Sequence, residues 1–96
     1  MAEHRFENNK EKNRYELHVG GNMAIAEYIV DNDEDVVKMT HTKTPEELAG
    51  QGIASELINK SLEDIKDQGL KVYPICSFVV GYIERHPEWQ SLVKAK

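Results

Sequence analysis

A loop that contains two glycines, residues 49–52, comes directly before a segment with a helical pattern of apolar residues. The first N–H groups of a helix have no intrahelical partner and lie at the positive end of the helix dipole, so a helix start can bind a phosphate group. Gly50 and Gly52 carry no Cβ, which lets the backbone approach such a group closely. The donors in this chain are the N–H groups from Gln51 to Ser55, although a plain helix-capping loop explains the pattern equally well.

Cys76 is the only cysteine, and it stands in a Pro-x-Cys-Ser sequence at the end of a predicted strand. A cysteine thiolate can accept an acyl group, and a thiol can protonate a leaving group. Both roles need assistance, because the pKa of an ordinary cysteine is about 8.5. His41 is the natural assistant if the fold brings the two strands together. The alternative interpretations are a small buried apolar residue for Cys76 and a hydrogen-bonded core residue for His41.

The composition argues against several classes of function. The net charge is −5, from 17 acidic and 12 basic residues, which is unfavourable for a nucleic-acid partner. No histidine, cysteine or carboxylate residues have the spacing of a metal-ligand motif, so no metal is expected. The apolar runs, such as residues 78–80, are too short to cross a bilayer, and no apolar leader follows Met1. Together with the single cysteine, these features predict a cytoplasmic protein without a membrane partner.

The N-terminal half predicts a meander of up to four antiparallel strands, at residues 4–7, 15–19, 23–30 and 36–42. Gly20-Gly21-Asn22 is a hairpin signal, because glycine and asparagine tolerate positive φ. The strand at 23–30 is apolar on both faces, which predicts that both faces are covered. In the strand at 36–42, the side chains of Val37, Met39 and His41 are expected to share one face.

The C-terminal half predicts helices around one more strand. Apolar residues about 3.6 positions apart predict a helix that ends at Gly69, and they are Ile53, Leu57, Ile58, Leu62 and Ile65. A strand at 70–75 contains Pro74, which is typical of a sheet edge. A short helix at 78–85 is broken by Pro87, and residues 87–93 form a last turn or helix. The fold class is therefore α/β or α+β, and residues 1–96 are expected to form a single domain.

The segment Ala49-Gly50-Gln51-Gly52-Ile53-Ala54 resembles the acetyl-CoA signature of the GNAT acetyltransferase superfamily, Arg/Gln-x-x-Gly-x-Gly/Ala. Gly52 and Ala54 match this signature, whereas Ala49 stands where the family usually has Arg or Gln. Further elements occur in the same order as in a subgroup of unusually small GNAT-like proteins. These are residues 14–17, residues 26–28, His41-Thr42, the Pro-x-Cys-Ser sequence at 74–77 and a His-Pro-x-Trp sequence at 86–89. The resemblance covers the chain from about residue 5 to residue 93.

The resemblance implies a trimmed GNAT fold with acetyl-CoA or coenzyme A as its co-substrate. The pyrophosphate is then held at a set of loop and helix-start residues: Gly50, Gln51, Gly52, Ile53, Ala54 and Ser55. The pantetheine arm lies between the strand that ends at Thr42 and the strand that ends at Cys76, with Ser77 beside it. Because Ala49 removes one side-chain contact, we expect weaker binding rather than none.

The reaction that the resemblance implies is transfer of an acetyl group to an amine acceptor, either a protein or a small molecule, which the sequence does not identify. Cys76 acts in it as a nucleophile or an acid, and His41 acts as a base or an orienting group. Two alternatives stay open. One is a module that binds coenzyme A or acetyl-CoA without turnover, which Ala49 and the missing acceptor-site elements favour. The other is a small interaction domain that has kept the fold and lost the ligand.

Overall fold

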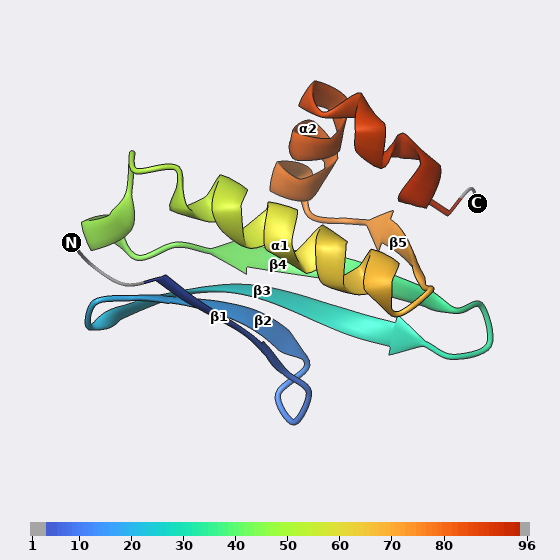
Figure 1. The fold of residues 1–96 in the computed structure, drawn as a ribbon, viewed down its shortest axis with the longest axis horizontal. Coiled ribbons are helices and arrows are strands. Elements are labelled where there is room, and N and C mark those ends of the chain that lie inside the picture. The colour runs from blue at the N-terminus through green and yellow to red at the C-terminus, as the bar shows by residue number, and fades with distance from the viewer. Residues whose placement is uncertain (1–3, 95–96) are drawn as a thin grey trace.

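The computed structural model describes residues 4–94, which form a five-stranded sheet with helices packed on it (Figure 1). The strands, in spatial order, are β1 (His4–Asn9), β2 (Arg14–Val19), β3 (Asn22–Asp31), β4 (Val36–Lys43) and β5 (Lys71–Pro74). Neighbours from β1 to β4 pair antiparallel, whereas β5 pairs parallel with β4. The mixed fold class and the four-strand meander are therefore confirmed, and the strand boundaries agree with the predicted ones within two residues.

Parallel pairing of β4 with β5 requires a crossover connection, and helix α1 (Ile53–Asp67) supplies it. Gly69 follows α1 with a φ of 75°, the left-handed conformation that ends many helices. The short 3-10 helix η1 (Glu46–Leu48) precedes α1, and helices α2 (Ser77–Arg85) and η2 (Pro87–Leu92) follow β5. None of the helices in residues 4–94 has the length and apolarity needed to cross a membrane.

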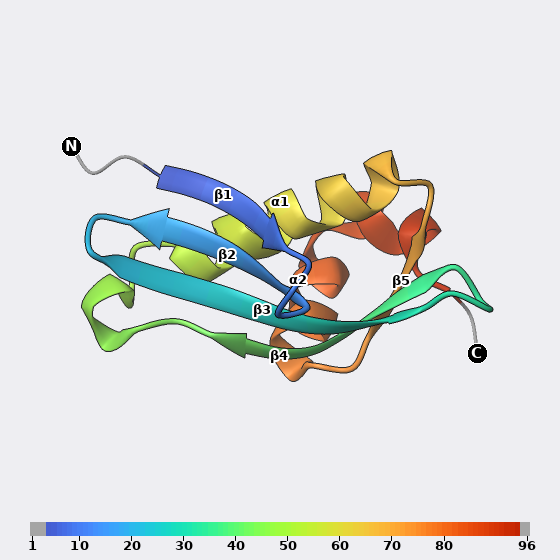
Figure 2. The same cartoon turned by 90° about the horizontal axis from the view of Figure 1, so that it is seen from below.

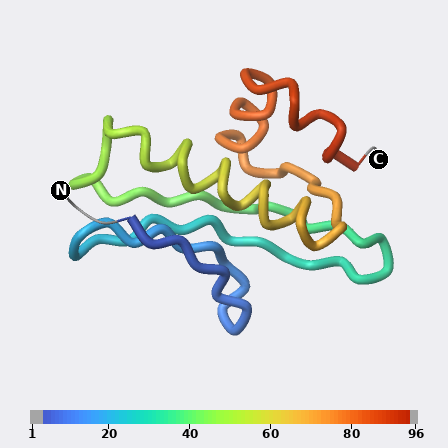
Figure 3. Tube along the Cα trace, viewed as in Figure 1, coloured from blue at the N-terminus to red at the C-terminus, as the bar shows by residue number. Residues whose placement is uncertain are grey.

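The hydrophobic core lies between the sheet and α1. The strands contribute every second side chain, such as Leu17 on β2 and Ala24 and Ala26 on β3, each with no exposed surface. From α1, the apolar positions Leu57, Ile58, Leu62 and Ile65 are likewise fully buried, as their helical spacing predicts. The apolar stripe of α1 therefore packs against the sheet. The Cα trace shows the helix running along the strands (Figure 3).

The face of the sheet opposite α1 carries no helix. Figure 2 shows α1 and α2 on the far side of the strands and an open sheet surface in front. Ile29 is accordingly 57% exposed, and Met23 and Ile25 are only half-buried. The prediction that both faces of this strand are covered is therefore wrong. An antiparallel sheet can leave one face to water, and both long helices of residues 4–94 pack on the other side.

A β-bulge in β4 changes which side chains share a face. Tyr28 of β3 pairs with Met39, but the preceding Glu27 pairs with His41, so Thr40 has no partner of its own. The extra residue reverses the order in which side chains of β4 alternate between the two faces of the sheet. His41 therefore lies on the open face, opposite α1, and Thr42 lies on the α1 face, paired with the buried Ala26. The prediction that His41 shares a face with Val37 and Met39 is therefore wrong.

Candidate functional site

Strands β4 and β5 part where the chain enters α2. Their pairing covers only Val36–Met39 of β4, although β4 continues to Lys43. The N–H groups of Ile75 and Cys76 both donate to the carbonyl of Met39, each at 3.0 Å. Beyond Met39, β4 therefore has no strand beside it on the β5 side, which is the opening that the GNAT resemblance assigns to the pantetheine arm.

Cys76 lies at this opening, half-buried, as the N-cap residue of α2. Its Sγ atom lies 3.4 Å from the Oγ1 atom of Thr42, on the neighbouring strand. Burial alone raises the pKa of the Cys76 thiol. Hydrogen bonds from the Thr42 hydroxyl and from the backbone N–H groups of Val79, Phe78 and Thr42 outweigh this effect, so the pKa of Cys76 lies below its usual value. The geometry therefore favours the thiolate, the nucleophilic form of cysteine.

His41 does not take part in this arrangement. It is exposed on the open face of the sheet, and its side chain forms no hydrogen bond or ion pair within residues 4–94. The structure thus brings Thr42 to Cys76 in the place that we had expected for His41. The cause is the bulge at Thr40, without which residues 39 and 41 would face the same way.

The glycine loop presents a run of backbone donors. Gly50 and Gly52 have φ values of 77° and 73°, in the left-handed region that favours glycine. Gly52 is the N-cap residue of α1, and the first helical hydrogen bond runs from the Glu56 N–H to the Gly52 carbonyl at 3.0 Å. The N–H groups from Gly50 to Ser55 have no hydrogen-bond partner within the described part of the chain. They can therefore serve an external anion.

A surface hollow of about 250 Å³ adjoins this loop. It is lined by loop and helix-start residues that the sequence had singled out, Gly50, Gly52, Ile53, Ala54 and Ser55, and by Thr44, Leu48, Ala49 and Phe78. Phe78 belongs to α2 and lies two residues after Cys76, so the hollow connects the glycine loop to the start of α2. Sequence reasoning missed Thr44, Leu48 and Phe78. Thr44 and Leu48 directly precede the loop, whereas Phe78 is brought to it only by the crossover through α1 and β5.

The remaining two predicted contact residues are exposed. The side chain of Gln51 donates to the carbonyl of Glu47 at 3.1 Å, which braces the loop from within. Ser77 is the first residue of α2 and is exposed beside Cys76. Ala49 is also exposed, and its methyl group offers no hydrogen bond to a ligand.

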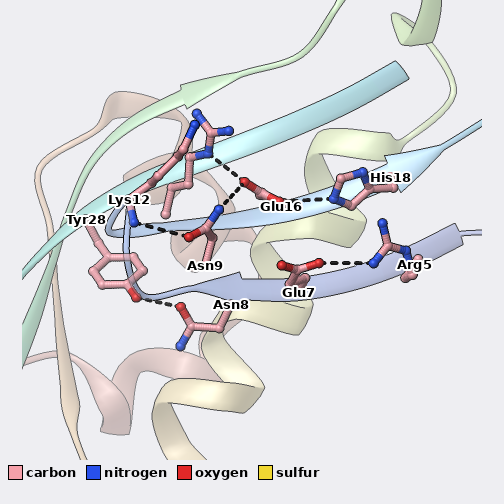
Figure 4. A network of polar contacts seen from close by, with 9 residues as sticks. Arg5, Glu7, Asn8, Asn9, Lys12, Glu16, His18 and Tyr28 are labelled. Carbon is pink, nitrogen blue, oxygen red and sulfur yellow. Dashed lines mark hydrogen bonds and ion pairs between the residues drawn. The ribbon is translucent and has the colours of Figure 1, made fainter. Parts of the chain in front are cut away.

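A separate polar cluster lies on the open face of the sheet (Figure 4). Ligand atoms of Glu7, Glu16 and His18 lie within 4.8 Å of one another, a grouping that spacing in the sequence does not reveal because two strands form it. Glu16 is 4% exposed and bonds Arg14 at 2.7 Å and His18 at 3.0 Å. Burial raises the pKa of Glu16, but hydrogen bonds from Arg14, Asn9 and His18 lower it to about 2. Because the Arg14 guanidinium already compensates its charge and Asn9 and His18 form hydrogen bonds to it, the cluster is explained as a polar network within the sheet.

Known proteins resemble this chain in sequence. The sequence profile of the GCN5-related N-acetyl-transferase family matches residues 14–92, which span β2 to η2. Protein NATD1 of Mus musculus is 23% identical over 87 residues, and the match covers 86% of this chain and 76% of that protein. Protein NATD1 of Homo sapiens is also 23% identical over 87 residues, with 74% of that protein covered.

The fold also has a counterpart among solved structures. The NMR structure of a GCN5-like protein from Staphylococcus aureus superposes with a TM-score of 0.70. The two chains are 24% identical, and the match covers 96% of this chain and 89% of the other. At 24% identity, the similarity to this structure shows the fold and does not assign roles to the residues of the site.

Proposed function

Because this chain belongs to the GCN5-related N-acetyltransferase family, we propose that it binds acetyl-CoA and transfers the acetyl group to an amine. The observation that carries the proposal is the run of unpartnered N–H groups from Gly50 to Ser55, beside a hollow that reaches the start of α2. The pyrophosphate of coenzyme A is an anion that such donors bind well. The lack of a basic or amide side chain at Ala49 makes the backbone the main contributor to this affinity.

In the proposed reaction, the Cys76 thiolate attacks the carbonyl carbon of the acetyl thioester. An acetyl-cysteine forms, and coenzyme A leaves as a thiolate that takes a proton from solvent. The acceptor amine then attacks the acetyl-cysteine, forming an amide bond and returning the Cys76 thiolate. The depressed pKa of Cys76 supports the first step, because it raises the fraction of thiolate at neutral pH.

The amine must lose a proton in this reaction, and we propose that solvent takes it. His41 is exposed on the open face of the sheet, opposite the face on which Thr42 contacts Cys76, so its imidazole is not placed to act on an amine at the thiol.

Calorimetric titration with acetyl-CoA, followed by intact mass after incubation, tests the proposal. We expect binding in the micromolar range and an added acetyl group that is removed by hydroxylamine, as a thioester is. The chain has one cysteine, so the label must disappear in Cys76→Ala while binding persists. Absence of binding at millimolar acetyl-CoA would refute the cofactor assignment.

A non-catalytic module that binds coenzyme A or acetyl-CoA is the second candidate function. The position of His41 on the opposite face from Thr42 favours it, because the thiol then lacks a histidine partner. Such a module is stabilised by its ligand, by about 2.7 kcal/mol at 100 times the dissociation constant. The module and the enzyme both bind acetyl-CoA. Only the enzyme forms an acetyl label on Cys76 and transfers the acetyl group to amines.

A further inference from the structure

Strand β3 has an unpaired stretch on the edge that faces β2. The pairing of β2 with β3 ends at Arg14 and Glu27, while β3 continues beside β4 as far as Asp31. Figure 2 shows β3 running on past the β1–β2 hairpin, and Figure 3 shows residues 10–13 bending away from it. Residues 29–31 of β3 are therefore an open strand edge within the described residues.

The backbone of Val30 is directed to this open edge. The Tyr28 N–H donates to the Asn13 carbonyl at 3.0 Å, so Tyr28 points its backbone groups toward the β2 side. Alternate residues of a strand point the same way, and the N–H and C=O groups of Val30 therefore face the position that β2 has left. Such a free pair of groups is a template for another strand.

The side chains around this edge are apolar and accessible. Ile29 and Val30 are two of the four large apolar residues that the described chain exposes. On the α1 side of the sheet, Val30 adjoins a hollow of about 430 Å³ whose lining includes Tyr28, Val37 and Leu70. A valine from an added strand fits beside Val30 in this hollow, because opposed residues of antiparallel strands share a face.

Opposite charges flank the two ends of the edge. The hairpin next to Tyr28 exposes Lys10 and Lys12 on either side of Glu11 and is positive on balance, and the turn after Asp31 exposes Asp33, Glu34 and Asp35. Neither lysine forms an ion pair within residues 4–94. A second strand that pairs antiparallel with this edge ends beside Lys10 and Lys12. If an acidic turn follows that strand, the turn lies next to the two lysines.

We propose that two copies of this chain pair antiparallel through residues 29–31 of β3, with Val30 of each copy opposite Val30 of the other. In this arrangement, the Val30 N–H of each copy donates to the Val30 carbonyl of its partner. The twofold axis places the acidic turn of each copy against the basic hairpin of the other, so the same contact forms twice. The two sheets become one continuous sheet, and both openings at Cys76 stay outside the interface, on the β5 side of β4.

A charge-exchange experiment tests this pairing by sedimentation velocity at protein concentrations from about 10 μM to 1 mM. We expect a concentration-dependent dimer that weakens as salt is added. The double variants K10E/K12E and D33K/E34K should each raise the dimer dissociation constant by about tenfold or more. An equimolar mixture of the two variants should form a heterodimer again, because each mismatched loop then faces an opposite charge.

Two controls keep the outcome specific. Glu84→Lys changes an exposed charge on α2 and should leave dimerisation unchanged. Amide exchange should show the Val30 N–H protected at high concentration and unprotected at low concentration. A chain that stays monomeric at 1 mM, or a dimer that both charge variants leave unaffected, would overturn the proposal.

Discussion

The polar groups at the two ends of α1 are satisfied in different ways. Near its C-terminal end, Asp64 accepts hydrogen bonds from Tyr15 at 2.9 Å, from Gln68 at 2.6 Å and from Asn8 at 3.3 Å. At its N-terminal end, the N–H groups from Gly50 to Ser55 have no partner within the described chain. Buried polar groups that are fully bonded stabilise a fold, whereas accessible donors without partners are available to a ligand.

The difference separates two functions of the same helix. The C-terminal end fixes the sheet to α1 through Tyr15, whose ring also lies 5.5 Å from Phe6 and 4.9 Å from Tyr28, measured between ring centroids. The N-terminal end packs on the core through the buried Ile53 and Leu57, and in addition it presents the glycine loop to solvent. Substitutions at the first end should therefore alter stability alone, and substitutions at the second should alter acetyl-CoA binding.

The largest expected effect is that of Tyr15→Ala. Tyr15 is 1% exposed, and its removal leaves a cavity and takes a donor from Asp64. We expect the free energy of unfolding, measured by urea denaturation, to fall by about 3–5 kcal/mol. Tyr15→Phe keeps the ring and should cost about 1 kcal/mol, while leaving acetyl-CoA affinity unchanged. A loss of affinity in Tyr15→Phe would show that the two ends are not independent.

Acid sensitivity is the second expected effect, and it comes from Glu16 on the sheet. The pKa of Glu16 is about 2 in the folded protein and near 4.5 when unperturbed. Between pH 2 and pH 4.5, the unfolded chain therefore binds more protons at Glu16 than the folded protein does. The stabilisation that ionised Glu16 contributes is complete above about pH 5 and is lost as the pH falls through 2. We expect Glu16 to contribute up to about 3 kcal/mol of unfolding free energy across this range. Glu16→Gln removes that part of the pH dependence, which denaturation series at several pH values measure.

Gly52→Ala should have the third largest effect, and it addresses the ligand end of α1. No atom lies within 4 Å of the added Cβ, but the φ of 73° is strained for alanine by about 1–2 kcal/mol. Relief of this strain turns the loop N–H groups, and we expect acetyl-CoA affinity to fall by about tenfold. Gly21→Ala is the matched control, because Gly21 has equal room and no positive φ. Equal affinity in both variants would exclude the loop as the phosphate site.

Local patterns predicted most of the fold, and contacts between strands decided the parts that were missed. The apolar spacing of α1, the Gly20-Gly21 hairpin and Gly69 each express a preference of a few adjacent residues. The bulge at Thr40 exists only in the pairing of β4 with β3, so the sequence alone placed His41 on the wrong face. The contact of Thr42 with Cys76 joins residues 34 positions apart for the same reason.

The smallest effect, and the one closest to the chemistry, concerns Thr42. Its hydroxyl is one of the groups that lower the pKa of Cys76, and the backbone N–H groups of Val79, Phe78 and Thr42 are the others. Thr42→Val keeps the shape and removes the side-chain hydrogen bond, so we expect the thiol pKa to rise. The rate of iodoacetamide alkylation as a function of pH measures this shift, because only the thiolate reacts.

Thr42→Ser is the matched control, because it keeps the hydroxyl and loses only a methyl group. Its alkylation profile should therefore follow that of the unchanged protein. His41→Ala should leave the profile unchanged as well, since His41 lies on the other face of the sheet. If His41→Ala shifts the thiol pKa and Thr42→Val does not, the histidine and not the threonine assists the thiol. The proposed role of the Thr42 hydroxyl in lowering the pKa of Cys76 would then be wrong.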